Sequence, residues 1–133
     1  MNAQDTVKVS QVMTASVHTI DAMATVQDAI QVMRTHKVSS LAVERRDEND
    51  EFGLLVIVDI AREVISKNRS TERVNVYEIM SKPVLTLPVD MKIKYAVRLL
   101  VRFDLSRALV VDSGRQPVGI VTLRDMVLCY GDD

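Results

Sequence analysis

The chain of 133 residues is poor in the residue types that build disulfide-linked, metal-bound or membrane-spanning proteins. A single cysteine, Cys129, excludes an intramolecular disulfide and a cysteine-rich zinc site. The two histidines, His18 and His36, are too few for most histidine-based metal centres. No apolar run approaches the roughly 20 residues that span a bilayer, and the N-terminus lacks the basic-then-apolar pattern of a signal peptide. We therefore expect no bound metal, no membrane partner and a cytoplasmic location.

Charge of one sign and aromatic side chains are also scarce. The 17 basic and 18 acidic residues leave a formal net charge of -1, so no global basic excess attracts nucleic acid or an anionic membrane. Tryptophan is absent, and two phenylalanines with three tyrosines offer little surface for stacking bases. Nucleic acid is therefore a disfavoured partner. Hydrophobic residues at 47% and charged residues at 26% are typical of a folded domain.

What the sequence does contain is an internal repeat. At a shift of 67 the coinciding positions include Val9/Val76, Met13/Met80, Thr19/Thr86, Ala29/Ala96 and Ser39/Ser106. The shift then becomes 66, where Gly53 matches Gly119 and Asp59 matches Asp125. Matches that keep their order across both segments indicate a duplication. We expect one copy over residues 9–65, a polar linker over 66–75 and a second copy over 76–130.

Each copy predicts the element order β-α-β-β-α. Apolar stripes at i, i+3, i+4 and i+7 predict helices that start near residues 26 and 93. Thr25 with Asp28 resembles a capping box, and Asp90 is a candidate cap for the second helix. Strands are expected at 40–44, 53–58, 107–111 and 117–122, with closing helices from about Asp59 and Asp125.

One such copy of about 60 residues would bury only a marginal core. Two copies can pack their sheets together. The expected fold is therefore α+β, of α/β type, with tandem β-α-β-β-α repeats packed sheet to sheet as one pseudo-two-fold module.

The segment Gly119-Ile120-Val121-Thr122-Leu123-Arg124-Asp125 resembles the Gly-apolar-apolar-Ser/Thr-x-x-Asp motif of the cystathionine beta-synthase (CBS) domain pair, or Bateman module. The first copy has the related segment Gly53-Leu54-Leu55-Val56-Ile57-Val58-Asp59, with Val56 where the hydroxyl belongs. The two methionine segments, Thr19, Thr86 and the duplication also fit this family. The resemblance covers about residues 9 to 130.

The motif has a direct physical interpretation. Its glycine lets another backbone approach closely. Its hydroxyl and carboxylate lie where a strand meets a helix, and there the first helical N–H groups can hold an anion such as phosphate. The carboxylate can accept hydrogen bonds from both ribose hydroxyls, while Thr122 can donate to a phosphate or ribose oxygen. Arg124 can add a charge-assisted contact.

In the family that the chain resembles, each nucleotide pocket is shared between the copies. This implies one pocket that joins Thr122 and Asp125 to Thr19, His18, Ser39 and Ser40. It implies a second that joins Asp59 to Thr86, Ser106 and Arg107. Val56 removes a hydrogen-bond donor from the second pocket, at a cost of about 1 kcal/mol or more, so we expect the Asp125 pocket to be the better site.

Each of these residues also has a structural alternative. The two aspartates can be helix N-caps, the threonines ordinary strand residues, and Arg107 and Arg124 solvated charges. Cations are favoured near a helix end, which accounts for His36 without a ligand. His18 suits a half-buried or pocket-lining role better than a metal site.

The resemblance implies a stand-alone regulatory module that binds an adenosine compound between the copies and signals to an unknown effector protein. AMP, ADP and ATP are the expected ligands, with S-adenosylmethionine and NAD as further candidates. A homodimer is implied as well. No catalytic motif was found, so we expect neither an enzyme nor a cofactor. The alternative is a structural interaction protein with vestigial pockets.

Overall fold

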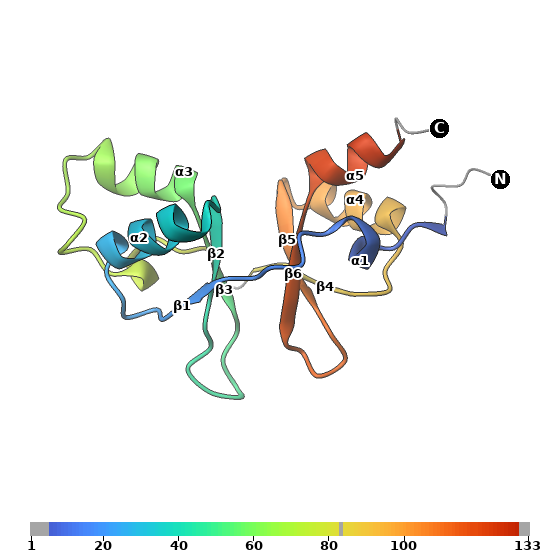
Figure 1. Cartoon of the computed structure of the whole chain (residues 1–133), viewed down its shortest axis with the longest axis horizontal. Coiled ribbons are helices and arrows are strands. Elements are labelled where there is room, and N and C mark those ends of the chain that lie inside the picture. The colour runs from blue at the N-terminus through green and yellow to red at the C-terminus, as the bar shows by residue number, and fades with distance from the viewer. Residues whose placement is uncertain (1–5, 83, 131–133) are drawn as a thin grey trace. The chain divides into compact units, whose positions relative to one another are not determined.

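The computed structural model describes residues 6–82 and 84–130 and divides the chain into two compact units. The central unit comprises His18–Val84. The terminal unit combines Met1–Val17 with Leu85–Asp133, so that it is built from both ends of the chain. Figure 1 shows the helices and strands of each unit.

The central unit has a three-stranded sheet in the order β1-β2-β3. Strand β1 is parallel to β2, and β2 is antiparallel to β3. Its elements are β1 (Thr19–Ile20), α2 (Val26–His36), β2 (Ser40–Val43), β3 (Gly53–Val56), α3 (Ile57–Ile60), a π-helical turn (Ala61–Ile65) and a 3-10 turn (Val76–Glu78). The expected strand over 53–58 is therefore too long, because residues 57 and 58 already belong to α3.

The terminal unit repeats this plan with a sheet in the order β4-β5-β6. Strand β4 is parallel to β5, and β5 is antiparallel to β6. Its elements are α1 (Val9–Val12), β4 (Thr86–Pro88), α4 (Ile93–Arg102), β5 (Arg107–Val111), β6 (Pro117–Thr122) and α5 (Leu123–Cys129). The strands expected at 107–111 and 117–122 are confirmed with these bounds.

Local side-chain chemistry sets the start of α2. Thr25 is the N-cap, and its Oγ1 accepts a hydrogen bond from the backbone N–H of Asp28 at 3.1 Å. The Asp28 carboxylate accepts in return from the backbone N–H of Thr25 at 3.2 Å. The capping box predicted from these residues is confirmed. In the second copy, however, Lys92 is the N-cap of α4 and Asp90 lies in the turn before it, so the predicted Asp90 cap is wrong.

Two clusters of buried apolar side chains are found in the described residues, one in each unit. Helix α2 contributes Val26, Ala29 and Met33 to the central cluster. Helix α4 contributes Ile93, Ala96 and Leu100 to the terminal cluster. These residues belong to the apolar stripes that predicted the helices, and the fourth member of each stripe, Ile30 or Val97, packs partly buried against its cluster.

The opening segment of each sequence repeat packs in the unit that holds the body of the other repeat. Val9 of α1 is fully buried in the terminal cluster, and Val76 is fully buried in the central cluster. Thr14 and Ile120 exchange two backbone hydrogen bonds, of 2.9 and 3.0 Å. Leu54 and Ser81 do the same in the central unit, at 2.9 Å each. Each unit therefore joins parts of both repeats through a short extra β-bridge.

Within the described residues, no helix is long and apolar enough to cross a membrane.

Candidate functional site

The junction of β6 and α5 places the hydroxyl and the carboxylate of the motif side by side. Thr122 is the last residue of β6 and the N-cap of α5, with φ −116° and ψ 152°. Its Oγ1 accepts a hydrogen bond from the backbone N–H of Asp125 at 3.1 Å. The helix begins at Leu123, whose N–H donates to the carbonyl oxygen of Ser106 at 2.8 Å. The alternative that Asp125 is itself the N-cap is therefore wrong, since Thr122 holds that position.

The equivalent junction of β3 and α3 lacks the hydroxyl. Val56 is the N-cap, and the Asp59 carboxylate accepts from the backbone N–H of Val56 at 3.2 Å. The N–H of Ile57 donates to the carbonyl oxygen of Ser39 at 2.9 Å. Asp59 is thus in the third helical position rather than the N-cap, which corrects the expected helix start here as well. Both aspartates are partly exposed and can accept further hydrogen bonds.

Strand register gathers the predicted residues at one edge of each sheet. In the terminal unit Arg107 lies opposite Thr122, at the edge where β5 begins and β6 ends, and Thr86 is at the nearby start of β4. This edge also holds Ser106 and Asp125. Within the terminal unit, Thr86, Ser106 and Arg107 therefore share an edge with Thr122 and Asp125, whereas the family resemblance had grouped these three residues with Asp59. In the central unit the same edge holds His18, Thr19, Ser39, Ser40 and Asp59.

The charged groups at the terminal junction are accessible. Arg124 is mostly exposed, and its Nη1 lies 3.6 Å from Oδ1 of the neighbouring Asp125. Arg107 is partly exposed. An exposed pair at this distance contributes little to stability. Both guanidinium groups are therefore available to an anion at little energetic cost to the fold.

Two side chains of the central edge have distinct environments. Ser40 is a buried polar residue with 8% of its surface exposed, and its hydroxyl forms no hydrogen bond within the described residues. A buried hydroxyl without a partner costs about 1–3 kcal/mol, which a ligand that hydrogen-bonds to it would recover. Thr19, by contrast, is exposed and donates from Oγ1 to the Glu44 carboxylate at 3.0 Å.

A stacked histidine pair was missed from the sequence. The rings of His18 and His36 are nearly parallel, with centroids 3.8 Å apart and an interplanar angle of 16°. His36 is the last residue of α2, and His18 directly precedes β1. No local pattern could have found this pair, since parallel pairing of β1 with β2 brings the end of α2 close to the start of β1. Within residues 6–82 and 84–130 no group of three or more His, Cys, Asp or Glu side chains could hold a metal ion.

Comparison with known proteins identifies a single family. The model of the CBS domain family matches the chain twice, over residues 9–66 and 76–131. An uncharacterized protein of Methanopyrus kandleri is 30% identical over 95 residues, which are 71% of this chain and 48% of that protein. The choline transport ATP-binding protein OpuBA of Bacillus subtilis is 32% identical over 126 residues, which are 95% of this chain and 31% of that protein. The chain thus spans less than half the length of these relatives.

Solved structures share the fold. The hexameric CBS-CP12 protein from bloom-forming cyanobacteria is 31% identical with a TM-score of 0.87, and the match covers 93% of this chain and 71% of that chain. Two more distant structures support the fold alone. The CBS domain pair of MJ0100, solved with 5-methylthioadenosine and S-adenosyl-L-methionine, is 24% identical with a TM-score of 0.77 and covers 94% and 96%. The CBS domain of a bacterial CNNM/CorC family Mg²⁺ transporter, solved with ATP, is 22% identical with a TM-score of 0.79 and covers 98% and 91%.

Proposed function

The chain belongs to the CBS domain family, whose paired domains are regulatory and binding modules rather than catalytic ones, and from this premise we propose that it binds an adenosine-containing ligand and passes that signal to an effector protein. AMP, ADP and ATP are the first candidates, followed by S-adenosylmethionine and NAD. Two proteins of the same fold were solved with adenosine compounds, and this makes adenosine compounds the first ligands to test. We place the protein in the cytoplasm, where these nucleotides are abundant.

The observation that carries the proposal is the junction of β6 and α5. Thr122, Asp125 and Arg107 meet there, with the hydroxyl 3.1 Å from the Asp125 nitrogen and the guanidinium on the residue opposite Thr122. A carboxylate suits the two ribose hydroxyls, and an arginine suits a phosphate.

We infer that the two junctions differ in their affinity for the ligand. Thr122 supplies a hydroxyl at the terminal junction, whereas Val56 supplies none at the central one. Arg107 lies opposite Thr122 at the terminal junction. The residue at the equivalent position of the central unit, opposite Val56, is the buried Ser40. The Asp125 junction therefore carries the tighter site, and the Asp59 junction carries a weaker one.

Isothermal titration with AMP, ADP, ATP, S-adenosylmethionine and NAD tests this proposal. Asp125→Ala should abolish the tighter binding event, while Asp59→Ala should leave it in place. The matched control is Asp90→Ala, which removes an exposed carboxylate of the same unit from the turn between β4 and α4, whereas the junction lies at the edge where β4 begins. Loss of the tighter event in Asp59→Ala alone would reverse the assignment.

The second candidate function is a structural interaction protein with vestigial pockets, favoured by Val56. The same ligand panel in a thermal-shift experiment separates the two. A functional site at saturating ligand, about 100 times the Kd, stabilises the folded protein by about 2.7 kcal/mol. If no compound of the panel raises the melting temperature, the pockets are vestigial and the structural role stands.

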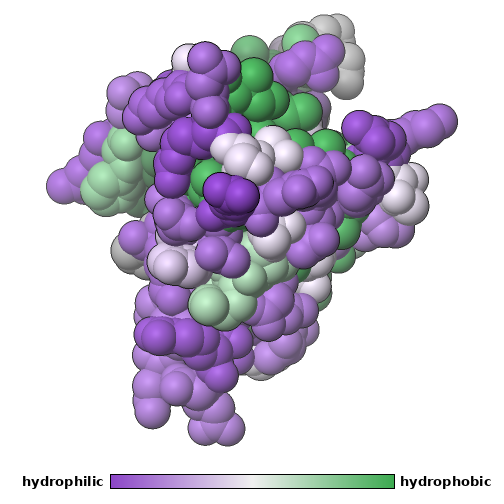
Figure 2. Space-filling model, turned by 90° about the vertical axis from the view of Figure 1, so that its left-hand side faces the viewer, coloured by the Kyte–Doolittle hydropathy of each residue, from purple (hydrophilic) through white to green (hydrophobic). Residues whose placement is uncertain are grey.

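We further propose that the chain forms a homodimer through its helices. The groove between α2 and α3, of about 320 Å³, is lined mainly by apolar residues. Ile57, Val58 and Ile65 around it are more than half exposed, as are Val127 and Leu128 of α5. Figure 2, which views the side that carries α2 and α3, shows apolar atoms exposed among hydrophilic ones. Exposed apolar side chains of this kind mark interaction surfaces. Light scattering at tens of micromolar should give the mass of a dimer, and a monomer would contradict the proposal.

A further inference from the structure

The central unit contains a second candidate binding site, a cavity of about 640 Å³. It lies where β1 and β2 end, whereas the Asp59 junction lies where these strands begin. Asp21 and Met23 follow β1, Glu44 and Arg45 follow β2, and Tyr77 comes from the exchanged opening segment of the second repeat. None of the residues predicted to bind a nucleotide lines this cavity. Its volume falls within the range of small-molecule sites, ~300–1,000 Å³.

One side of the cavity has an excess of positive charge. Arg46 and Lys82 both contact the carboxylate of Asp50, at 3.4 and 2.6 Å. The hydrogen bond from Lys82 holds the pKa of Asp50 well below its usual range, so that this carboxylate is ionised and compensates one of the two cations. Arg45 lies over the ring of Phe52 at 4.8 Å and forms no ion pair within the described part of the chain. These contacts fix the positions of Arg45, Arg46 and Lys82. The single negative charge of Asp50 neutralises only part of their combined positive charge.

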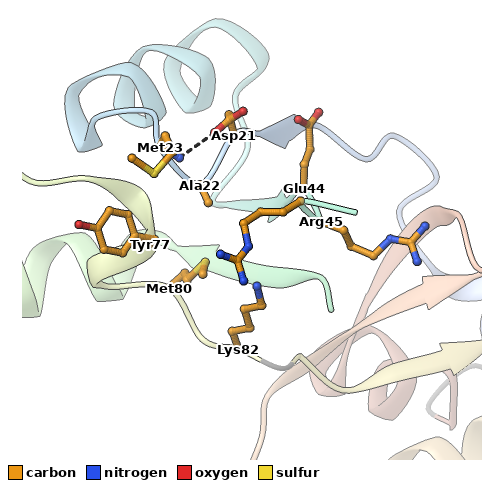
Figure 3. Close-up of a pocket in the computed structure, with 9 residues that line it drawn as sticks. Asp21, Ala22, Met23, Glu44, Arg45, Tyr77, Met80 and Lys82 are labelled. Carbon is orange, nitrogen blue, oxygen red and sulfur yellow. Dashed lines mark hydrogen bonds between the residues drawn. The ribbon is translucent and has the colours of Figure 1, made fainter. Parts of the chain in front are cut away.

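The other side carries negative charge and apolar surface. Asp21 accepts a hydrogen bond from the backbone N–H of Met23 at 2.7 Å, which fixes its carboxylate. Glu44 is fixed by the hydroxyl of Thr19. Figure 3 shows Asp21 and Lys82 on opposite sides of the cavity, with Tyr77 and Met80 along a third side. Tyr77 is 50% exposed and Met23 is 68% exposed, so both offer apolar area that the fold leaves uncovered.

The internal repeat supplies a built-in comparison. At the shift of 67 that aligns β1 with β4, the charged and aromatic lining residues fall on neutral or oppositely charged ones. The pairs are Asp21/Pro88, Glu44/Val111, Arg45/Asp112, Tyr77/Ser10 and Lys82/Ala15. The shared fold therefore does not require this lining. It is a property of the central unit alone.

We propose that this cavity binds a small zwitterion with an apolar body, of the class of the free α-amino acids. The carboxylate of the ligand faces Arg45 and Lys82, its ammonium group faces Asp21 and Glu44, and its body covers Tyr77 and Met23. A purely anionic or purely cationic ligand would desolvate one of the two charged sides without pairing it, which is costly. This site is separate from the adenosine site proposed above and does not depend on it.

Isothermal titration with L-phenylalanine as the probe tests the proposal on the full chain. One saturable event is expected. N-acetyl-L-phenylalanine lacks the ammonium charge and L-phenylalanine amide lacks the carboxylate, and each should bind at least about tenfold more weakly, because each loses a hydrogen bond between charged groups. No saturable heat up to millimolar probe, or equal binding of all three compounds, would overturn the proposal.

Two variants locate the site. Tyr77→Ser introduces the counterpart from the other repeat, and Arg45→Ala removes a cation that has no ion pair among the described residues. Both should weaken L-phenylalanine binding about tenfold or more, and each should keep the cooperative thermal unfolding transition of the parent protein, which shows that it folds. Tyr95→Ser, which removes a comparably exposed tyrosine from α4, is the matched control and should bind the probe normally. Unchanged binding in both variants, or loss of binding in Asp125→Ala, would contradict the assignment.

Discussion

Gly119 lies so close to Met13 that a Cβ atom at position 119 would fall 2.8 Å from Cγ of Met13 and 3.0 Å from the carbonyl oxygen of Thr14. Such contacts are shorter than side chains tolerate. The chain that approaches this glycine is the opening segment of the first repeat, which pairs with Ile120 at this point. The glycine of the family motif therefore admits a neighbouring backbone, as the sequence suggested for a glycine in a strand.

Gly119→Ala should destabilise the terminal unit by about 1–3 kcal/mol, because the new methyl group meets backbone as well as a side chain. Urea denaturation at neutral pH measures this loss. Gly114→Ala is the control, since the nearest atom to its added Cβ would be Asp112 Oδ1 at 3.4 Å and its φ is not positive. Equal stability of the two variants would mean that the bridge between Thr14 and Ile120 does not form.

Exchange of the N-cap residues between the two junctions should change stability in opposite directions. Thr122→Val removes the hydroxyl that caps α5 and should cost about 1 kcal/mol. Val56→Thr gives α3 the same cap and should stabilise it by a similar or smaller amount, since Asp59 already occupies the third helical position. Thermal unfolding of both variants measures the direction of each change in melting temperature. A higher melting temperature for Thr122→Val than for the parent protein would show that the Thr122 hydroxyl does not stabilise α5.

The capping box of α2 should contribute measurably to the stability of the central unit. Thr25→Ala removes the acceptor for the N–H of Asp28 and should cost about 1 kcal/mol. Thr35→Ala, an exposed change in the last turn of the same helix, should be neutral or slightly stabilising because alanine has the higher helix propensity. The urea denaturation midpoint of Thr25→Ala should therefore be lower than that of Thr35→Ala by more than the experimental error.

The ion pairs of Asp50 should make stability depend on pH. The pKa of Asp50 is lowered in the folded protein, mainly by its hydrogen bond with Lys82 and then by the backbone N–H of Arg46. Its contribution is therefore complete above the unfolded pKa of about 3.9 and is lost as the pH falls below that value towards the folded pKa. Asp50→Asn should lower the denaturation midpoint at pH 7, and its difference from the parent should shrink progressively below pH 4.

Glu48→Gln is the control for this pH series. Glu48 is an exposed carboxylate of the same loop, and no ion pair is found for it within the described residues. Its stability difference from the parent should be small at every pH. A difference for Asp50→Asn that stays constant from pH 7 to pH 2 would show that the pairs with Arg46 and Lys82 do not matter.

Much of the local structure could be predicted from the sequence, because it depends on residues within one or two turns. The stripes of α2 and α4 predicted which side chains are buried, and Thr25 with Asp28 predicted a cap that forms. The predictions that were wrong also concern residues close together in the sequence. Asp90 and Lys92 both precede α4, and the extended backbone of Lys92 makes it the N-cap. Asp59 and Asp125 were expected near the starts of their helices, but each helix begins two residues earlier, at Ile57 or Leu123, and its N-cap is Val56 or Thr122.

The candidate nucleotide site could be predicted as a set of residues from the repeated motif, but its geometry depended on strand register. Sequence alone gave no indication that Arg107 would lie opposite Thr122, or that the Ser40 hydroxyl would be buried without a hydrogen bond among the described residues. The stacked rings of His18 and His36 and the cavity beside Tyr77 were missed for the same reason. Each joins residues that no short sequence pattern connects.

The sequence by itself determined the duplication, the order of helices and strands in each copy, and the family, because periodicity and motif spacing are properties of neighbouring residues. Only the tertiary structure decided how the copies divide into compact units. Val9 and Val76 each bury their side chains in the unit that holds the body of the other repeat. That exchange depends on burial of apolar surface and on hydrogen bonds between distant segments, and such long-range contacts leave no mark in the local order of the residues.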